Sequence, residues 1–128
     1  MPAVRRLQHA SVPMPVGGAE EARRFYGRAL DMPEIHRPRG LSHLMLVWFS
    51  AGPDGDEVHC FEEENTGPNS PGQHLCLEVD DIEAYRARLE SHGFPVEAAD
   101  PIYNRPRFFV HDPFGNRVEL TQILGQFE

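Results

Sequence analysis

Four residues that could do chemistry lie in four separate runs with the alternating pattern of β-strands. They are three histidines and one glutamate: His9, His59, His74 and Glu119. Because successive strand side chains point to opposite faces of a sheet, apolar neighbours such as Val58 and Cys60 share the face opposite to His59. Imidazole and carboxylate groups bind divalent metals and transfer protons. We therefore expect helices to cover the apolar faces and the polar groups to gather on the opposite faces.

The first half of the chain has the order strand, helix, strand, strand. A run typical of a strand, Arg6 to Pro13, precedes Ala19 to Leu30, where apolar residues recur at the spacing of one helix face. Two further strand-like runs, Leu44 to Ser50 and Glu57 to Glu62, flank a segment rich in Gly, Pro and Asp. Such a segment favours a turn, so we expect these two runs to form a hairpin.

The second half of the chain repeats this order. A strand is predicted over His74 to Val79, and a helix over Asp81 to His92 follows, with Asp80 and Glu83 at the spacing of a capping box. The last two strands are expected on either side of a Pro- and Gly-containing turn: Arg107 to His111 and Arg117 to Gln122. The repeat predicts two similar modules, residues 1–64 and 73–128, joined by a polar linker over 65–72.

Length and charge limit what the protein could bind. The chain has 128 residues and a formal net charge of −8, without a basic cluster that would favour nucleic acid. Its longest apolar stretch, Leu44 to Phe49, is too short to cross a bilayer, and its start lacks the apolar run of a signal peptide. We therefore expect a cytoplasmic protein with a small-molecule substrate. We also expect a homodimer, because short modules leave open sheet edges that self-association could cover.

Two motifs resemble one known family. The segment Phe108 to Leu120, with the letters FFVHDPFGNRVEL, resembles the FxxDPxGNxxEL hairpin of the vicinal oxygen chelate superfamily, which includes glyoxalase I, bleomycin- and fosfomycin-resistance proteins and extradiol dioxygenases. The segment Arg24 to Leu30 is similar to the FYxxxLG pattern of that superfamily's first helix, with Asp31 in place of Gly. The resemblance extends over Leu7 to Gln122 and implies an α+β fold of two βαβββ modules whose mixed sheet curls into a cup.

The same resemblance implies a metal site, because the superfamily takes its ligands from the first and last strands of each module. Carried onto this chain, the implied ligands are the residues that strand alternation collects: His9, His59, His74 and Glu119. Two imidazoles and a carboxylate suit a divalent ion such as Fe, Mn, Ni, Co or Zn. Glu119, a carboxylate ligand that can loosen, is then the expected general base. Whether His59 is a fourth ligand stays open, because several members have Glu, Gln or no ligand at its place.

The function implied is that of an enzyme whose metal binds adjacent oxygens of a small metabolite, as in a lyase, an isomerase or a ring-opening dioxygenase. Glutathione-dependent glyoxalase I is disfavoured, because Pro13 and Glu63 replace the Arg and Asn that it carries. The alternative is a bleomycin-resistance-type protein that sequesters a small aromatic ligand without catalysis. The expected substrate contacts are two aromatic side chains of the strands and two residues of a loop: Phe61, Phe109, Tyr103 and Arg105. The sequence leaves open whether the modules pair within one chain or between two.

Overall fold

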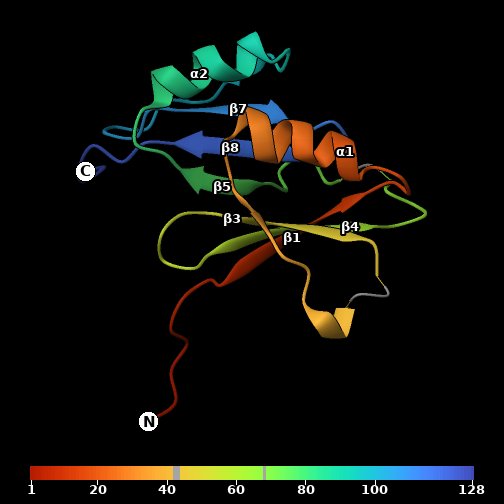
Figure 1. Cartoon of the computed structure of the whole chain (residues 1–128). Coiled ribbons are helices and arrows are strands. Elements are labelled where there is room, and N and C mark those ends of the chain that lie inside the picture. The colour runs from red at the N-terminus through yellow and green to blue at the C-terminus, as the bar shows by residue number, and fades with distance from the viewer. Residues whose placement is uncertain (42–43, 68) are drawn as a thin grey trace.

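The computed structural model describes residues 1–41, 44–67 and 69–128. It contains two four-stranded sheets, with the strand orders β1-β4-β3-β2 and β5-β8-β7-β6 (Figure 1). In each sheet the first and last strands of the module run parallel, and the other neighbours run antiparallel. These features confirm an α+β fold of two βαβββ modules. The predicted linker over 65–72 includes residue 68, which lies outside the described residues.

The elements follow the same order in both modules. Those of the first module are β1 (His9–Met14), α1 (Ala19–Ala22), η1 (Arg23–Ala29), β2 (Glu34–Ile35), η2 (Arg39–Leu41), β3 (Leu46–Ser50) and β4 (Glu57–Glu62). Those of the second module are β5 (Leu75–Glu78), α2 (Ile82–Ser91), β6 (Val96–Ala98), β7 (Arg107–His111) and β8 (Arg117–Thr121). Among the helices of the described residues, none has the length and apolar character needed to cross a membrane.

The first helix differs from the regular α-helix predicted over Ala19 to Leu30. After the single α-helical turn of α1, the η1 segment is π-helical, and the Leu30 amide donates to the Phe25 carbonyl oxygen, five residues back, at 2.9 Å. The wider turn allows the adjacent residues Phe25 and Tyr26 both to be fully buried. The apolar spacing alone does not separate a π-helical turn from an α-helical one.

Other differences concern element ends and short strands. The sequence pattern did not locate β2 and β6, which have two and three residues and pair with only one neighbour each. Runs this short contain too few alternating residues to show a period. The predicted capping box was wrong by one residue, because Asp81, not Asp80, caps α2 and accepts a hydrogen bond from the Ala84 amide at 3.0 Å.

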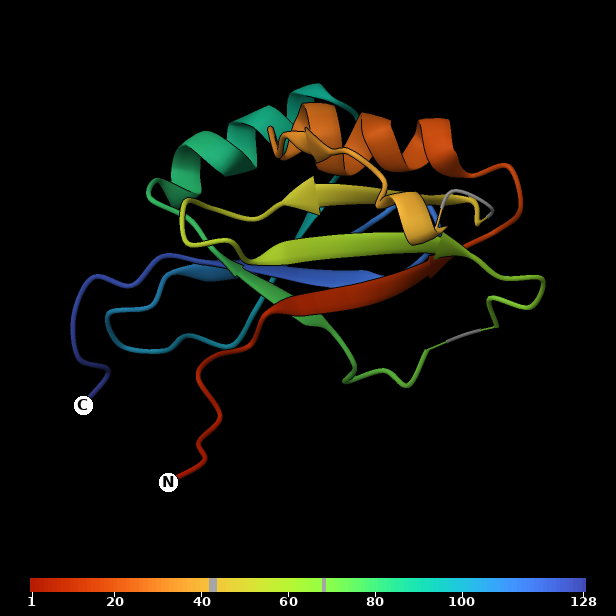
Figure 2. The same cartoon turned by 60° about the horizontal axis from the view of Figure 1, so that its bottom comes forward.

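The helices of the two modules lie side by side and pack on the inner faces of the sheets, so that both modules share one hydrophobic core (Figure 2). The Arg88 guanidinium of α2 donates to the carbonyl oxygen of Ala29 in η1 at 2.9 Å. The Tyr85 hydroxyl donates to the carbonyl oxygen of Leu30 at 3.0 Å. The outer face of each sheet therefore lies away from the helices and is available for a site.

A buried polar network also joins the modules. Asp112, at the start of the turn between β7 and β8, is only 4% exposed and accepts hydrogen bonds from the Tyr26 hydroxyl at 2.7 Å and the Asn116 side-chain amide at 2.8 Å. Asn116 also donates to the carbonyl oxygen of Pro13 in β1 at 2.9 Å. Burial raises the pKa of Asp112, while its bonds to Asn116 and Tyr26 oppose that rise. The turn between β7 and β8 is therefore joined to the first module by buried hydrogen bonds.

Replacing Tyr26 by Phe should destabilise the protein by about 1–3 kcal/mol, because one oxygen of buried Asp112 loses its donor from the other module. Urea unfolding of the variant measures the change in the free energy of unfolding. Tyr103→Phe is the matched control, because the Tyr103 side chain is 70% exposed and its variant should be as stable as the wild type. Equal stability of the two variants would show that the Tyr26 hydroxyl contributes nothing.

Candidate metal centre

The outer faces of the two sheets present the candidate ligands at equivalent positions. His59 in β4 lies opposite Ser11 in β1, and His9 precedes Ser11 by two residues. In the second sheet Glu119 lies opposite Cys76, and His74 precedes Cys76 by two residues. The inner-face neighbours of these positions are buried in the core, as strand alternation requires. The repeat in the sequence is thus also a repeat in register, with one pair of candidate ligands on each sheet.

His74 and Glu119 form the pair of the second sheet. The Nε2 atom of His74 lies 3.0 Å from Oε1 of Glu119, and its Nδ1 atom lies 2.8 Å from the carbonyl oxygen of Gly72. A carbonyl oxygen only accepts, so Nδ1 carries the hydrogen and Nε2 of the neutral ring keeps its lone pair. Two acceptors then face each other across 3.0 Å, and only a shared proton or a metal ion makes that contact favourable.

His9 and His59 form the pair of the first sheet. Their rings stack with centroids 4.1 Å apart, and the other face of His59 stacks on Trp48 at 3.6 Å. Nε2 of His59 lies 2.8 Å from Oε1 of Glu57, so it donates there. Burial lowers the pKa of His59 and the bond to Glu57 opposes that effect, which favours a neutral ring.

His9 and His59 differ in which ring nitrogen donates a hydrogen bond. Nδ1 of His9 lies 2.7 Å from the side-chain oxygen of Gln8, so Nδ1 donates and Nε2 keeps a lone pair. His9 and His74 therefore share one tautomer, with Nδ1 held by a neighbouring oxygen and Nε2 able to bind a metal. Metal-binding histidines usually donate the hydrogen of their other ring nitrogen to such an oxygen.

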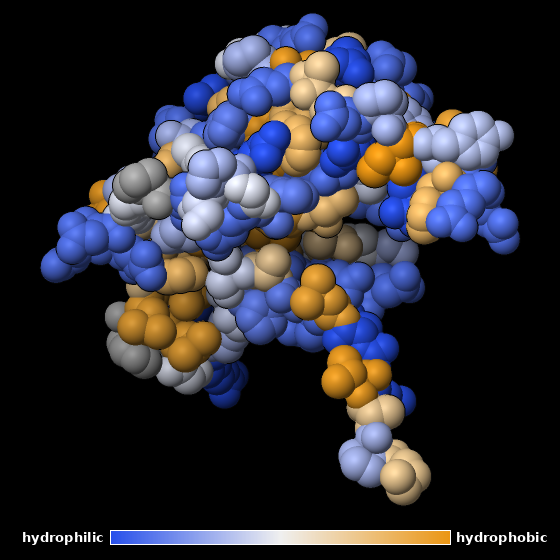
Figure 3. All heavy atoms as spheres, turned by 180° about the vertical axis from the view of Figure 1, so that it is seen from behind, coloured by the Kyte–Doolittle hydropathy of each residue, from blue (hydrophilic) through white to orange (hydrophobic). Residues whose placement is uncertain are grey.

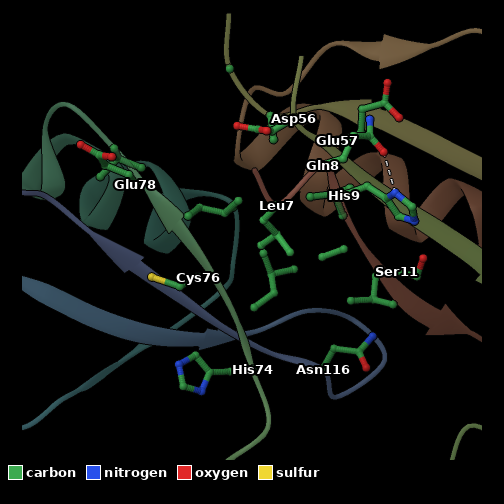
Figure 4. A pocket seen from close by; sticks show the side chains of 18 of the residues that line it. Leu7, Gln8, His9, Ser11, Asp56, Glu57, His74, Cys76, Glu78 and Asn116 are labelled. Atoms are coloured by element: carbon green, nitrogen blue, oxygen red, sulfur yellow. Dashed lines mark hydrogen bonds between the residues drawn. The ribbon is translucent and has the colours of Figure 1, made fainter. Parts of the chain in front are cut away.

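Within one chain the two pairs do not meet. Among the described residues, no group of three or more His, Cys, Asp and Glu side chains is placed to hold a metal ion. A groove of about 800 Å³ lies between the edge strands β1 and β5. Figure 4 shows His9 near Gln8 and Glu57 on one side of this groove, and His74 and Cys76 on the other. A three-ligand centre made of the described residues thus requires a second chain or a movement of the modules.

The residues expected to contact a substrate are distributed unevenly. Phe109 lies opposite Glu119 on the outer face, and its ring meets that of His74 edge-on at 5.2 Å. Phe61 follows His59 by two residues in β4, so it lies on the same outer face, and it is half-buried. Tyr103 is exposed in the loop before β7, whereas Arg105, two residues on, is half-buried with its guanidinium 4.7 Å from the Phe127 ring.

The sequence reasoning missed Arg107 and Arg117. Nη1 of Arg107 lies 3.3 Å from Oε2 of Glu119, and the guanidinium of Arg117 lies 3.6 Å from the centroid of the Phe109 ring. The signal was present, because strand alternation places both arginines on the face that carries Phe109 and Glu119. Arg107 orients the carboxylate and makes its surroundings more positive.

Cys76 lies between these charged groups. Burial raises the pKa of its thiol to about 11, the charge of Glu119 acts in the same direction, and the charges of Arg107 and Arg105 oppose it. The thiol is therefore neutral and is a poor metal ligand and nucleophile.

The comparisons with known proteins agree on the fold. The family model described as the Glyoxalase/Bleomycin resistance protein/Dioxygenase superfamily matches residues 6–120. A structure from Bacillus anthracis, described as a glyoxalase family protein, is 32% identical, with 96% of this chain and 98% of that chain covered and a TM-score of 0.86.

Two other structures share the fold at lower identity. TnmS3, an antibiotic binding protein from Streptomyces, is 24% identical, with 96% and 99% of the two chains covered and a TM-score of 0.76. The fosfomycin resistance protein FosX from Listeria monocytogenes is 14% identical, with 97% and 96% covered and a TM-score of 0.75. Among curated proteins, none matches the chain significantly.

Proposed function

Because the chain belongs to the glyoxalase, bleomycin resistance protein and dioxygenase superfamily, we propose that it is a metal-dependent enzyme acting on a small oxygenated metabolite. The proposed ligands are His74 and Glu119 of one chain and His9 of a second copy. The reaction class is that of a lyase, an isomerase or a ring-opening dioxygenase.

The contact between His74 and Glu119 carries this proposal. Two ligand atoms that bind one ion at about 2.1 Å lie about 3.0 Å apart at the right angles of an octahedral site, and about 3.4 Å apart in a tetrahedral site. The distance between Nε2 of His74 and Oε1 of Glu119 is 3.0 Å. Both side chains are also held from behind, His74 by the Gly72 carbonyl oxygen and Glu119 by Arg107. This close, held pair of donor atoms supports the proposal that a divalent ion binds here.

A second copy of the chain could supply the third ligand. His9 has the tautomer that leaves Nε2 able to bind a metal, but it lies on a different sheet from His74. Pairing the outer face of one copy's first sheet with the outer face of the other copy's second sheet would bring His9 to Glu119. Such a homodimer is symmetric and would contain the centre twice.

Exposed apolar groups support this self-association. Residues 1–8 form no helix or strand, and the start of the chain extends away from both sheets, as Figures 1 and 3 show. Within this segment Val4 is 94% exposed and Leu7 is 82% exposed. Leu7 also lines the groove between β1 and β5. Covering these side chains favours a dimer through the hydrophobic effect.

The residues around the proposed centre would have separate roles in the reaction. When bound, the metal would polarise adjacent oxygens of the substrate. After leaving the ion, Oε1 of Glu119 would accept the proton, while Arg107 holds Oε2 in place. The rings of Trp48 in the first sheet and Phe109 in the second sheet would cover the site and exclude water.

Metal analysis tests the proposal first. Protein purified without a chelating tag should contain about one divalent ion per chain, because a dimer of two chains contains two centres. Elemental analysis measures this ratio. Dialysis against a chelator should remove the ion and any turnover together. Metal dependence would be refuted if the purified protein contained no divalent ion, took up none of Mn, Fe, Co, Ni or Zn, and kept its activity in the presence of a chelator.

His59 is assigned a supporting role, because its Nε2 donates to Glu57 and its ring is stacked between His9 and Trp48. His59→Phe should preserve the stacking and retain the wild-type metal content. The same elemental analysis measures this variant beside His74→Ala. If both variants lose metal equally, His59 is a fourth ligand.

The aromatic stack supports a second candidate function. Trp48, His59 and His9 form a continuous stack of flat rings on the outer face of the first sheet. Such a surface suits a planar aromatic ligand, and one protein of the same fold is described as antibiotic binding. Binding of an aromatic antibiotic that is unaffected by chelation, together with no turnover of any candidate substrate, would favour sequestration over catalysis.

A further inference from the structure

Two buried side-chain atoms in and beside the second sheet lack a hydrogen-bond partner. They are Nε of Arg105 and Oγ1 of Thr121, and they are the buried side-chain atoms without a partner in the part of the chain that the structure describes. Thr121 is only 8% exposed, so water does not easily replace the missing partner. Buried polar groups are nearly always hydrogen-bonded, so these two atoms are candidate contacts for a bound molecule.

Thr121 lies on the outer face that carries Glu119, and Arg105 lies in the loop directly before β7. Thr121 follows Glu119 by two residues in β8 and lies opposite Arg107 in β7. Arg105 precedes Arg107 by two residues, and the Gln122 amide donates to the Pro106 carbonyl oxygen at 3.0 Å, which continues the pairing of these segments. Arg105 and Arg107 both act electrostatically on Cys76, so both guanidinium groups lie near this part of the sheet.

The two arginines are already oriented by the chain. The guanidinium of Arg105 lies over the Phe127 ring of the C-terminal segment at 4.7 Å. Arg107 donates from Nε and Nη2 to the Asp100 carbonyl oxygen at 3.2 and 3.0 Å. Side chains held in this way lose little conformational entropy when a ligand binds.

This part of the outer face carries carboxylates as well as arginines, because Glu78 in β5 lies opposite Thr121. Arg105 and Arg107 carry two positive charges, and Glu119 is the carboxylate that pairs with Arg107. Among the described residues, Arg105 has no ion-pair partner. A divalent ion on Glu119 would add positive charge beside Arg105, and a ligand with anionic oxygens would offset it.

We propose that Arg105, Arg107 and Thr121 form a subsite for an anionic oxygen group of the substrate, a carboxylate or a phosphate-type group, beside His74 and Glu119. The guanidinium groups donate to the anionic oxygens, and the Thr121 hydroxyl donates a further hydrogen bond. The inference rests on the proposed function for its link to catalysis, and it narrows the substrate to an anionic oxygenated metabolite.

Calorimetric titration of the chelator-treated full chain tests the subsite without the metal. The probes are inorganic phosphate and acetate, and the one that binds more tightly identifies the group. Arg105→Gln should weaken binding on the order of tenfold, because a hydrogen bond to a charged group is lost. Thr121→Val, which keeps the side-chain shape, should weaken binding by a smaller factor.

Arg28→Gln is the matched control, because it also removes one positive charge but lies on the exposed surface of η1. It should bind the anion as the wild type does. Far-UV circular dichroism and the unfolding temperature show whether each variant is folded, and Thr121→Val serves if Arg105→Gln is not. Wild-type protein that binds neither anion, or folded Arg105 and Thr121 variants that bind as tightly as the wild type, would overturn the subsite.

Cobalt loading of the same proteins separates this inference from the proposed function. If the wild type binds the anion through Arg105 but binds no cobalt, the metal centre fails and the subsite stands. If the wild type binds cobalt but anion binding is unchanged in Arg105→Gln, the subsite fails and the metal centre stands.

Discussion

Alanine at His9 and alanine at His74 should each remove the bound metal, because either change leaves only two of the three proposed ligands. Two remaining ligands hold a divalent ion weakly, and the metal content measured by elemental analysis should fall to the level of a chelator-treated sample. His36→Ala is the matched control, since His36 follows β2 and lies outside the two ligand pairs. Undiminished metal in either ligand variant would contradict the assignment of that residue.

Mixing the two variants tests where the ligands come from. If His9 of one chain joins His74 and Glu119 of the other, a dimer of one His9→Ala chain and one His74→Ala chain contains one intact centre and one doubly damaged centre. After unfolding and refolding together, random pairing should restore about a quarter of the wild-type metal. If the ligands come from a single chain, mixing restores none. The described residues of one chain bring no three such ligands together, which favours recovery.

Replacing Glu119 by Gln should lower turnover on the order of 100-fold or more, with part of the metal retained. An amide oxygen can still bind the ion, but it cannot accept the proton that the carboxylate is proposed to take at Oε1. The measurement is the rate per bound metal, with a substrate found by screening anionic vicinal diols, catechols and α-hydroxycarbonyl compounds.

Glu57→Gln provides the comparison for Glu119→Gln. Glu57 bonds to His59 at 2.8 Å on the other sheet and is no proposed ligand, so its variant should keep both metal and turnover within a few-fold of the wild type. A Glu119→Gln enzyme with full metal and wild-type turnover would leave Glu119 as a ligand only and exclude its role as the base.

Alternation along the strands was enough to place the candidate ligands on one face of each sheet. His59 and Glu119 occupy equivalent register positions in β4 and β8, opposite Ser11 and Cys76. This outcome follows from a local rule, since a period of two residues fixes the face of every side chain once a run is a strand. The strand Arg107 to His111 was predicted with its observed ends, because a clear turn follows it.

Tertiary structure decided which of these residues meet and in what chemical state. The approach of His74 to Glu119 at 3.0 Å depends on the parallel pairing of β5 with β8, whose residues are about forty positions apart. The tautomer of His74 depends on the Gly72 carbonyl oxygen, and the orientation of Glu119 depends on Arg107. Local periodicity contains no information about such partners, because they are fixed by long-range packing of strands and loops. For the same reason the sequence could place two pairs of ligands but could not show that one chain keeps them apart.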